Sequence, residues 1–162
     1  MKAITIHEPW ASLIAIGGKH FETRGWETNY RGQIAIHASK KEPLSMLRTL
    51  PTSVQNSIMN CFYEKYSINS RAIDRMHAGN VVATAELVNC YEIHIDHTGD
   101  AVLMRHGYPK IWLGKESNEY QFGFYDHGRY AWELTNVERL IIPIPAKGQQ
   151  GLWNWNLEGV QP

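Results

Sequence analysis

Residues 18–24 of the chain read Gly18-Lys19-His20-Phe21-Glu22-Thr23-Arg24, so a lysine, a carboxylate and an arginine fall within seven residues. The end of this stretch is predicted to be a strand. Because successive side chains of a strand point to opposite faces, Glu22 and Arg24 share a face and Thr23 lies on the other. Lys19 follows a glycine turn and is free to point over the face of Glu22 and Arg24. Such a polar cluster binds ligands through charge-assisted hydrogen bonds or shifts a pKa for catalysis.

Two interpretations of this cluster are open. In the first, Arg24 donates its planar guanidinium to a carbonyl or phosphate, Lys19 supplies a point charge, and Glu22 accepts from an exocyclic amine. In the second, the three residues form an exposed salt bridge that only fixes the strand. The two neighbouring cations predict that Glu22 stays ionised, and Glu22 in turn predicts that Lys19 keeps its proton.

The apolar pattern along the chain predicts several short strands and one helical block. A first helix begins at Pro9, which suits a first helical turn, and ends at Gly17 and Gly18. Residues 42–76 have a helical pattern, and residues 92–121 are expected to be irregular apart from a strand at 92–95. Strands are predicted over residues 2–6, 21–24, 33–38, 81–88, 129–134 and 138–142.

These elements together predict an α+β fold. One domain is expected to span residues 1–162, with the helical block at about 42–76 as an insertion. Many short strands with few helices favour a small, mainly antiparallel β-barrel with peripheral helices.

Composition narrows the class of protein. The 162 residues carry 16 Lys plus Arg and 16 Asp plus Glu, and this zero net charge favours a local pocket over a long basic track for nucleic acid. Cys61 and Cys90 have no CxxC spacing and are predicted to be reduced thiols of a cytoplasmic protein. The apolar N-terminal run is interrupted at His7 and Glu8, too early for a signal peptide, and no apolar run has the length of a membrane span.

Further motifs flank the polar cluster along the chain. They are Pro9-Trp10-Ala11-Ser12-Leu13-Ile14, Trp26, Tyr30-Arg31-Gly32, Ile36-His37-Ala38-Ser39, Gly128-Arg129-Tyr130-Ala131-Trp132 and Lys147-Gly148-x-x-Gly151-Leu152-Trp153. Together with the Gly-x-Lys-x-x-Glu-x-Arg pattern that ends at Arg24, these motifs resemble the ASCH domain family, apart from the block at 42–76. The resemblance implies a fold similar to the PUA domain, a small β-barrel with a cleft between barrel and helices, and a link to RNA or modified nucleosides.

Members of the family that the chain resembles differ in activity. Some bind nucleic acid, some are reported ribonucleases, and some small ones hydrolyse the amide of N4-acetylcytidine. In the amidohydrolases, the residue three positions after the Lys is a Thr, proposed to act with the Lys and a distant Glu. This chain has Glu22 at that position, and Thr23 is expected on the opposite face. The Thr-dependent mechanism therefore does not carry over directly.

Tryptophans flank the cluster. Trp26, between Gly25 and Glu27, is predicted to lie in an exposed loop and to stack on a base, a contact worth about 1–3 kcal/mol. Trp10 at the helix start is the other ring near the cluster. Packing in the core or at its rim is the alternative for both rings.

A second polar patch completes the set of candidate ligand-binding residues. Tyr30, Arg31 and His37 can hold a phosphate or a ribose, whereas the alternative makes Arg31 a turn residue and His37 a hydrogen-bonded strand residue. Arg129 and Lys147 are distant in sequence, and only the resemblance brings them near the site.

The run His94-Ile95-Asp96-His97 invites a metal interpretation, because His94 and Asp96 share a face of a strand. Catalytic zinc uses three protein ligands with supporting partners, and no third ligand lies at a recognised spacing. Neither a nucleophile elbow nor a Gly-rich phosphate loop occurs in the sequence. We therefore predict neither a metal nor another cofactor.

Taken together, the residues and the resemblance predict a module that binds RNA, DNA or a modified nucleoside. Its polar cleft would contain Lys19, Glu22 and Arg24, with aromatic stacking beside it. The alternative is an enzyme, either an N4-acetylcytidine-type amidohydrolase or a ribonuclease, with Lys19 and Glu22 as the acid–base pair. The expected proton on Lys19 and the missing Thr favour binding.

Overall fold

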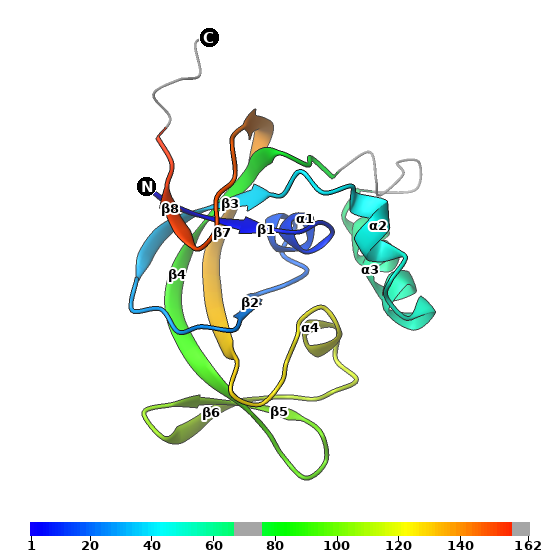
Figure 1. The fold of residues 1–162 in the computed structure, drawn as a ribbon. Coiled ribbons are helices and arrows are strands. Elements are labelled where there is room, and N and C mark those ends of the chain that lie inside the picture. Colours follow the sequence, from blue (N-terminus) through cyan, green and yellow to red (C-terminus); the bar gives the residue numbers. More distant parts are fainter. Residues whose placement is uncertain (67–75, 157–162) are drawn as a thin grey trace. The chain divides into compact units, whose positions relative to one another are not determined.

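A computed structural model describes residues 1–66 and 76–156 of the chain (Figure 1). Its elements, in chain order, are β1 (Lys2–Ile6), α1 (Trp10–Ala15), β2 (Phe21–Arg24), β3 (Gly32–Ala38), α2 (Pro43–Leu47), α3 (Thr52–Tyr66), β4 (Asn80–Ile95), β5 (Ala101–Arg105), β6 (Tyr108–Leu113), α4 (Asn118–Gln121), β7 (Tyr130–Pro145) and β8 (Leu152–Asn154).

An eight-stranded sheet dominates these elements, and the predicted α+β class is confirmed. The strands follow the order β2-β7-β4-β3-β1-β8, and β5 pairs with β4 and β6. The pairing of β1 with β3 is parallel, whereas β1–β8, β2–β7, β4–β5 and β5–β6 are antiparallel. Because this order is open, with β2 and β8 at its two ends, closure into a barrel stays a prediction.

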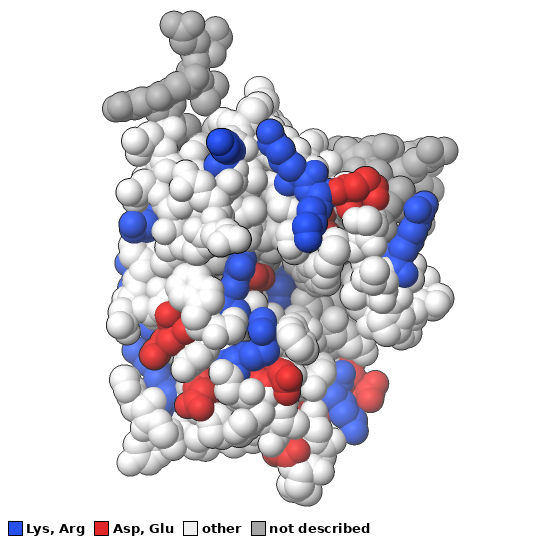
Figure 2. All heavy atoms as spheres, viewed as in Figure 1, with Lys and Arg blue, Asp and Glu red and all other residues white. Residues whose placement is uncertain are grey.

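The chain divides into two compact units, which we describe separately. The first unit contains residues 1–18, 33–85 and 136–162, and the second contains residues 19–32 and 86–135. The long strands β4 and β7 contribute residues to both. Within each unit, the face drawn in Figure 2 carries Lys and Arg side chains as well as Asp and Glu side chains, in keeping with the zero net charge.

In the first unit, β1 lies between β3 and β8 and contributes to an apolar core. Leu13 and Ile14 are buried on the inner face of α1. The helix ends as predicted, because the amides of Gly17 and Gly18 donate to carbonyls of its last turn. Gly17 has a φ of +78°, a conformation that glycine adopts without strain. The sheet side of the core is formed by Ala3, Ala35, Val81, Trp153 and Trp155, with Leu140, Ile144 and Ala146 packed against them.

In the second unit, the predicted strand over Phe21–Arg24 is confirmed and pairs with β7. The register places Glu22 opposite Trp132 and Arg24 opposite Tyr130. The core of this unit is formed by Phe21, Tyr91, Ile93, Ala101, Leu103, Tyr125 and Ala131.

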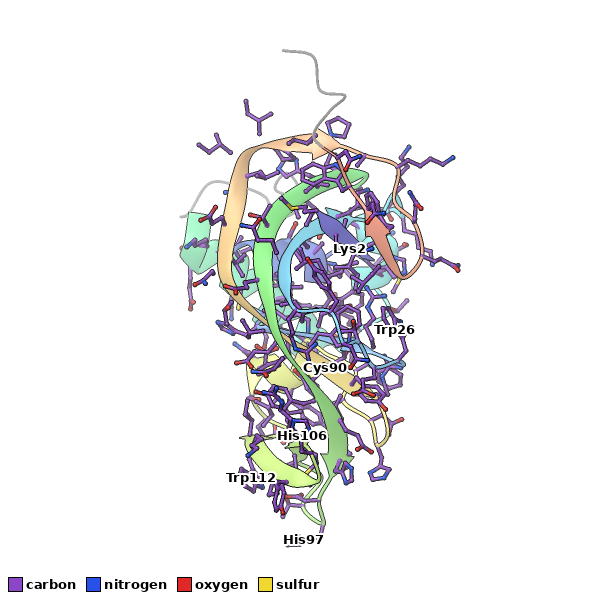
Figure 3. The ribbon with its side chains drawn as sticks, turned by 90° about the vertical axis from the view of Figure 1, so that its left-hand side faces the viewer. Lys2, Trp26, Cys90, His97, His106 and Trp112 are labelled. Carbon is purple, nitrogen blue, oxygen red and sulfur yellow. The ribbon has the colours of Figure 1, made fainter. Side chains whose placement is uncertain are left out.

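The prediction of irregular structure over residues 92–121 is wrong beyond the strand at 92–95. This segment contains the end of β4, the hairpin of β5 and β6, and α4. The exposed rings of Tyr108 and Trp112 on β6 break the apolar alternation that would have indicated a strand. Trp112 lies on β6, and His106 marks the turn that joins β5 to β6 (Figure 3).

Two further differences concern lengths. The strands predicted at 129–134 and 138–142 form one continuous strand, β7, in which Asn136 takes a φ of +48°. The predicted helical block contains α2 and α3, while its residues 67–75 lie outside the described residues. Among the helices that the structure describes, none has the length and apolar character needed to cross a membrane.

Candidate functional site

Lys19 is the most unusual side chain of the second unit, because it is only 1% exposed. Its ammonium group is buried and forms no hydrogen bond with any residue that the structure describes. The Nζ atom lies 3.9 Å from Oε1 of Glu119 and 6.0 Å from the ring centre of Tyr125. A buried ammonium without a hydrogen-bond acceptor is costly, so it is poised to bind one.

Glu119 on α4 holds the start of β2. Its Oε2 accepts from the His20 amide at 2.8 Å, and its Oε1 accepts from the Phe21 amide at 3.1 Å. The phenol of Tyr125 donates to Oε1 at 3.3 Å, and Nδ1 of His20 lies 3.2 Å from Oε2. We call Lys19, His20, Glu22, Arg24, Glu119 and Tyr125 the Lys19 cluster.

The contacts within the Lys19 cluster shift several pKa values. Burial lowers the pKa of Lys19, although the charges of Glu22 and Glu119 act in the opposite direction. Burial alone would raise the pKa of Glu119, but hydrogen bonds from His20 and Phe21 together with the charge of Lys19 hold it below its ordinary value. Burial therefore makes Lys19 a weaker base than an ordinary lysine, while the charge of Glu22 favours its protonated form, as the sequence indicates.

Glu22 and Arg24 lie on one face of β2, as predicted. Nε of Arg24 is 3.0 Å from Oε1 of Glu22, and Glu22 is only 8% exposed. Thr23 serves the opposite face, where its hydroxyl accepts from the amide of Phe124 at 2.9 Å. Thr23 is therefore occupied as a structural acceptor and does not replace Glu22 on the face of the cluster.

Trp26 is 38% exposed, in agreement with the predicted exposed loop. Its ring meets the ring of Trp132 edge to face at 4.6 Å, and its carbonyl accepts from Nε1 of Trp132 at 3.4 Å. Packing against Trp132 thus fixes the Trp26 ring, and the exposed part of the ring can stack on a base. Trp10 is half-buried at the start of α1, in the first unit.

Arg129 lies beside β2, where its guanidinium donates to the carbonyls of Phe124 at 3.0 Å and Thr23 at 3.4 Å. The same group lies 4.3 Å from the ring centre of Phe124, which is 61% exposed. Arg129 thus supports an exposed ring that sequence reasoning did not identify.

Two other predicted residues of the second unit, Tyr30 and Arg31, lie in the loop before β3. Nη1 of Arg31 donates to the carbonyls of Thr28 at 2.8 Å and Tyr30 at 2.7 Å. The amide of Tyr30 in turn donates to the hydroxyl of Thr28 at 3.1 Å. These contacts favour the structural interpretation of Arg31, although both side chains remain partly accessible.

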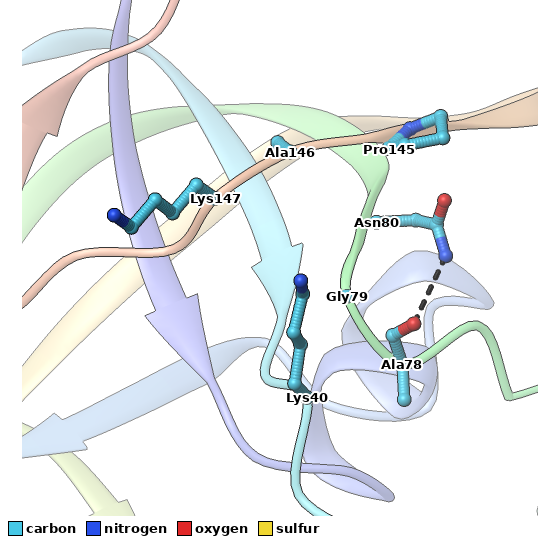
Figure 4. A pocket seen from close by; sticks show the side chains of 7 residues that line it. All are labelled: Lys40, Ala78, Gly79, Asn80, Pro145, Ala146 and Lys147. Carbon is cyan, nitrogen blue, oxygen red and sulfur yellow. Dashed lines mark hydrogen bonds between the residues drawn. The ribbon is translucent and has the colours of Figure 1, made fainter.

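His37 and Lys147 belong to the first unit. His37 is buried on β3, with Nε2 3.1 Å from the carbonyl of Ala146 and its ring 5.8 Å from that of Trp153. Lys147 lines a cavity of about 610 Å³, shown in Figure 4. The other residues that line it are Lys40, Ala78, Gly79, Asn80, Pro145 and Ala146.

The segment considered for a metal has a different arrangement. Nε2 of His94 lies 3.1 Å from Oε1 of Glu92, and the His94 ring meets the ring of His127 at 4.7 Å. Within residues 1–66 and 76–156, no group of three or more His, Cys, Asp or Glu side chains is placed to hold a metal ion.

The family model of the ASCH domain matches residues 4–144, which is most of the chain. The chain belongs to the ASCH domain family. Forty residues of this ASCH domain are 45% identical to Activating signal cointegrator 1 of Homo sapiens, and the protein of that name in Mus musculus matches equally. The match covers 25% of this chain and 7% of each relative, so the chain spans only a small part of the curated relatives' length.

Sequence reasoning missed Glu119, which lies in the stretch expected to be irregular, and Tyr125, which lies between that stretch and the strand predicted from residue 129. A local signal for α4 does exist. Ser117 is its N-cap, accepting from the amide of Tyr120 at 3.3 Å, and Glu119 adds an acidic residue in the first turn. Such a pattern is typical of a helix start, but it cannot reveal that Glu119 reaches the beginning of β2.

Proposed function

We propose that this ASCH domain is a binding module that recognises a nucleobase, in RNA or DNA or as a modified nucleoside, through the Lys19 cluster. The observation that carries the proposal is the buried ammonium of Lys19, which forms no hydrogen bond within the described residues. A ligand carbonyl would supply the acceptor that this ammonium lacks.

The neighbouring side chains complete the recognition of a base edge. Glu22 accepts from an exocyclic amine, and Arg24 holds Glu22 in place through their 3.0 Å contact while donating to a carbonyl or phosphate. The exposed part of Trp26 stacks on the base or on its neighbour. The zero net charge supports recognition at a local site over a long grip on the phosphate backbone.

Family membership supports the same proposal. The resemblance to ASCH domains implies a link to RNA and modified nucleosides, and it also implies the closed PUA-like barrel that we propose for the sheet. We further propose that the protein acts in the cytoplasm, since both cysteines are free.

The test is a Glu22→Gln variant, with Glu27→Gln as the matched control because Glu27 is exposed. Binding of a panel of nucleosides and of single-stranded oligonucleotides is measured by calorimetry, and thermal stability is followed in parallel. Glu22→Gln should lose most of the binding while the protein stays folded, and Glu27→Gln should bind as the wild type does. Wild-type affinity in Glu22→Gln would show that the cluster does not hold the base.

A hydrolase is the second candidate, favoured by the burial of Lys19, which lowers its pKa against the opposing charges of Glu22 and Glu119. Neutral Lys19 would take a proton from water, whose oxygen attacks the acyl carbon of an amide. The carbon–nitrogen bond then breaks, and the departing amine takes the proton back, giving an acid and an amine.

Mass spectrometry separates the two candidates. Wild-type protein and Lys19→Ala are incubated with modified nucleosides, N4-acetylcytidine included. Turnover by the wild type that disappears in Lys19→Ala would establish the hydrolase. Binding of a panel member without turnover would establish the module.

A further inference from the structure

The cavity of the first unit is positively charged. Its lining contains Lys40 and Lys147 but no Asp or Glu, although the chain as a whole carries equal numbers of acidic and basic residues. Figure 4 shows the two lysines coming from different segments, Lys40 from the loop after β3 and Lys147 from the segment after β7. Neither ammonium has a carboxylate partner among the described ion pairs.

Backbone hydrogen bonds hold the walls of this cavity together. The Gly79 amide donates to the carbonyl of Ala38 at 2.8 Å, and the Ala146 amide donates to the carbonyl of Gly79 at 3.1 Å. The loop after β3, the turn before β4 and the segment after β7 are thereby joined. Lys40 and Lys147 consequently extend from a fixed frame, which reduces the entropy lost on binding.

Gly79 and Asn80 shape the turn beneath Lys40. Gly79 has a φ of +81°, and a Cβ at this position would lie 3.1 Å from Cγ of Lys40, so the lysine stem packs directly over the glycine. Nδ2 of Asn80 donates to the carbonyls of His77 and Ala78 at 3.1 and 3.0 Å, which fixes the turn. The aliphatic stem of Lys40 is therefore supported while its ammonium reaches the cavity.

From this arrangement we infer that the cavity binds a phosphate group of the sugar–phosphate backbone of a single-stranded nucleic acid. Two lysines and no acidic residue in the lining favour an anion, lysine binds phosphate as a point charge, and the proposed function supplies a polymer that carries phosphates. The inference rests on the proposed function for the identity of the polymer, but it uses residues outside the Lys19 cluster.

The experiment uses an abasic single-stranded oligonucleotide, which presents phosphates without bases. Binding is followed by fluorescence anisotropy and by the NMR shifts of the amides of Gly79, Asn80, Ala146 and Lys147. Lys40→Gln with Lys147→Gln should weaken binding at least tenfold at low salt, about the effect of one charge-assisted hydrogen bond. The slope of log affinity against log salt should fall by about 0.7 for each phosphate contact removed.

Glutamine keeps the first carbons of the lysine stem, so the packing over Gly79 is preserved in the variant. The matched control is Lys65→Gln, which removes an exposed charge of α3 in the same unit. It should change the affinity less than twofold. A double variant with wild-type affinity and salt slope, or amide shifts that avoid the cavity, would overturn the inference.

Two further arms identify the source of the phosphate. The assignment to a nucleic-acid backbone would be overturned if inorganic phosphate or polyglutamate bound more tightly than the abasic strand. Glu22→Gln separates this inference from the proposed function, because it should leave abasic binding unchanged while losing the base. Unchanged nucleoside binding in Glu22→Gln would contradict the proposed function alone, whereas unchanged abasic binding in the double lysine variant would contradict this inference alone.

Discussion

The ammonium of Lys19 lies 3.9 Å from Oε1 of Glu119, a carboxylate that also accepts from two backbone amides at the start of β2. Glu119 therefore has two functions at once. It fixes the backbone that carries Lys19, and it supplies negative charge beside a buried cation. The position of the cluster and its charge consequently depend on the same side chain.

The dual role of Glu119 predicts that Glu119→Gln is destabilised. The variant loses the charge-assisted hydrogen bonds from His20 and Phe21 and leaves the Lys19 charge with less compensation, so we expect a loss of about 1–3 kcal/mol in the free energy of unfolding. Urea denaturation measures this free energy of unfolding. Glu116→Gln, an exposed neighbour, should stay within about 0.5 kcal/mol of the wild type. Equal stability of the two variants would contradict the role of Glu119.

His20 offers a direct readout of the same carboxylate. Its hydrogen bond to Glu119 raises the pKa of His20 above the ordinary 6.5. A raised pKa stabilises the fold below that ordinary value, and the contribution is lost as the pH rises through the folded-state pKa. NMR titration of the imidazole should give an elevated pKa in the wild type and a lower one in Glu119→Gln. An identical titration in both proteins would assign the shift to another cause.

The polar face of β2 could be predicted from sequence because it depends only on local geometry. The period of a strand places Glu22 and Arg24 together and sends Thr23 to the other side, as the structure confirms. The end of α1 was predictable for a similar reason, since a glycine supplies the left-handed conformation that ends a helix.

The partners of Lys19 were not predictable in this way. Glu119 and Tyr125 reach the cluster through tertiary packing, which the local sequence does not show. The sequence shows the neighbouring charge of Glu22 but not the burial that lowers the pKa of Lys19. The burial of a polar side chain depends on how the whole unit packs, so the local sequence does not reveal it.

Trp26 provides a test of stacking. Its ring is partly exposed and rests edge-on against Trp132, so Trp26→Ala should weaken binding of a base-containing oligonucleotide by about 1–3 kcal/mol. Trp112→Ala is the matched control, because Trp112 is a 61% exposed tryptophan on β6. Fluorescence anisotropy with the same oligonucleotide compares the two variants. Equal affinities would mean that Trp26 only packs on Trp132.

Gly148 tests the packing next to Lys147, which lines the cavity of the first unit. A Cβ added there would lie 2.5 Å from Cε1 of His37 and 2.9 Å from Oγ1 of Thr5, so Gly148→Ala must displace a buried ring. Overpacking of this kind costs about 1–3 kcal/mol. Gly114→Ala is the control, since nothing lies within 4 Å of its added Cβ. Thermal denaturation should show a lower Tm for Gly148→Ala alone, and an unchanged Tm would mean that His37 moves aside freely.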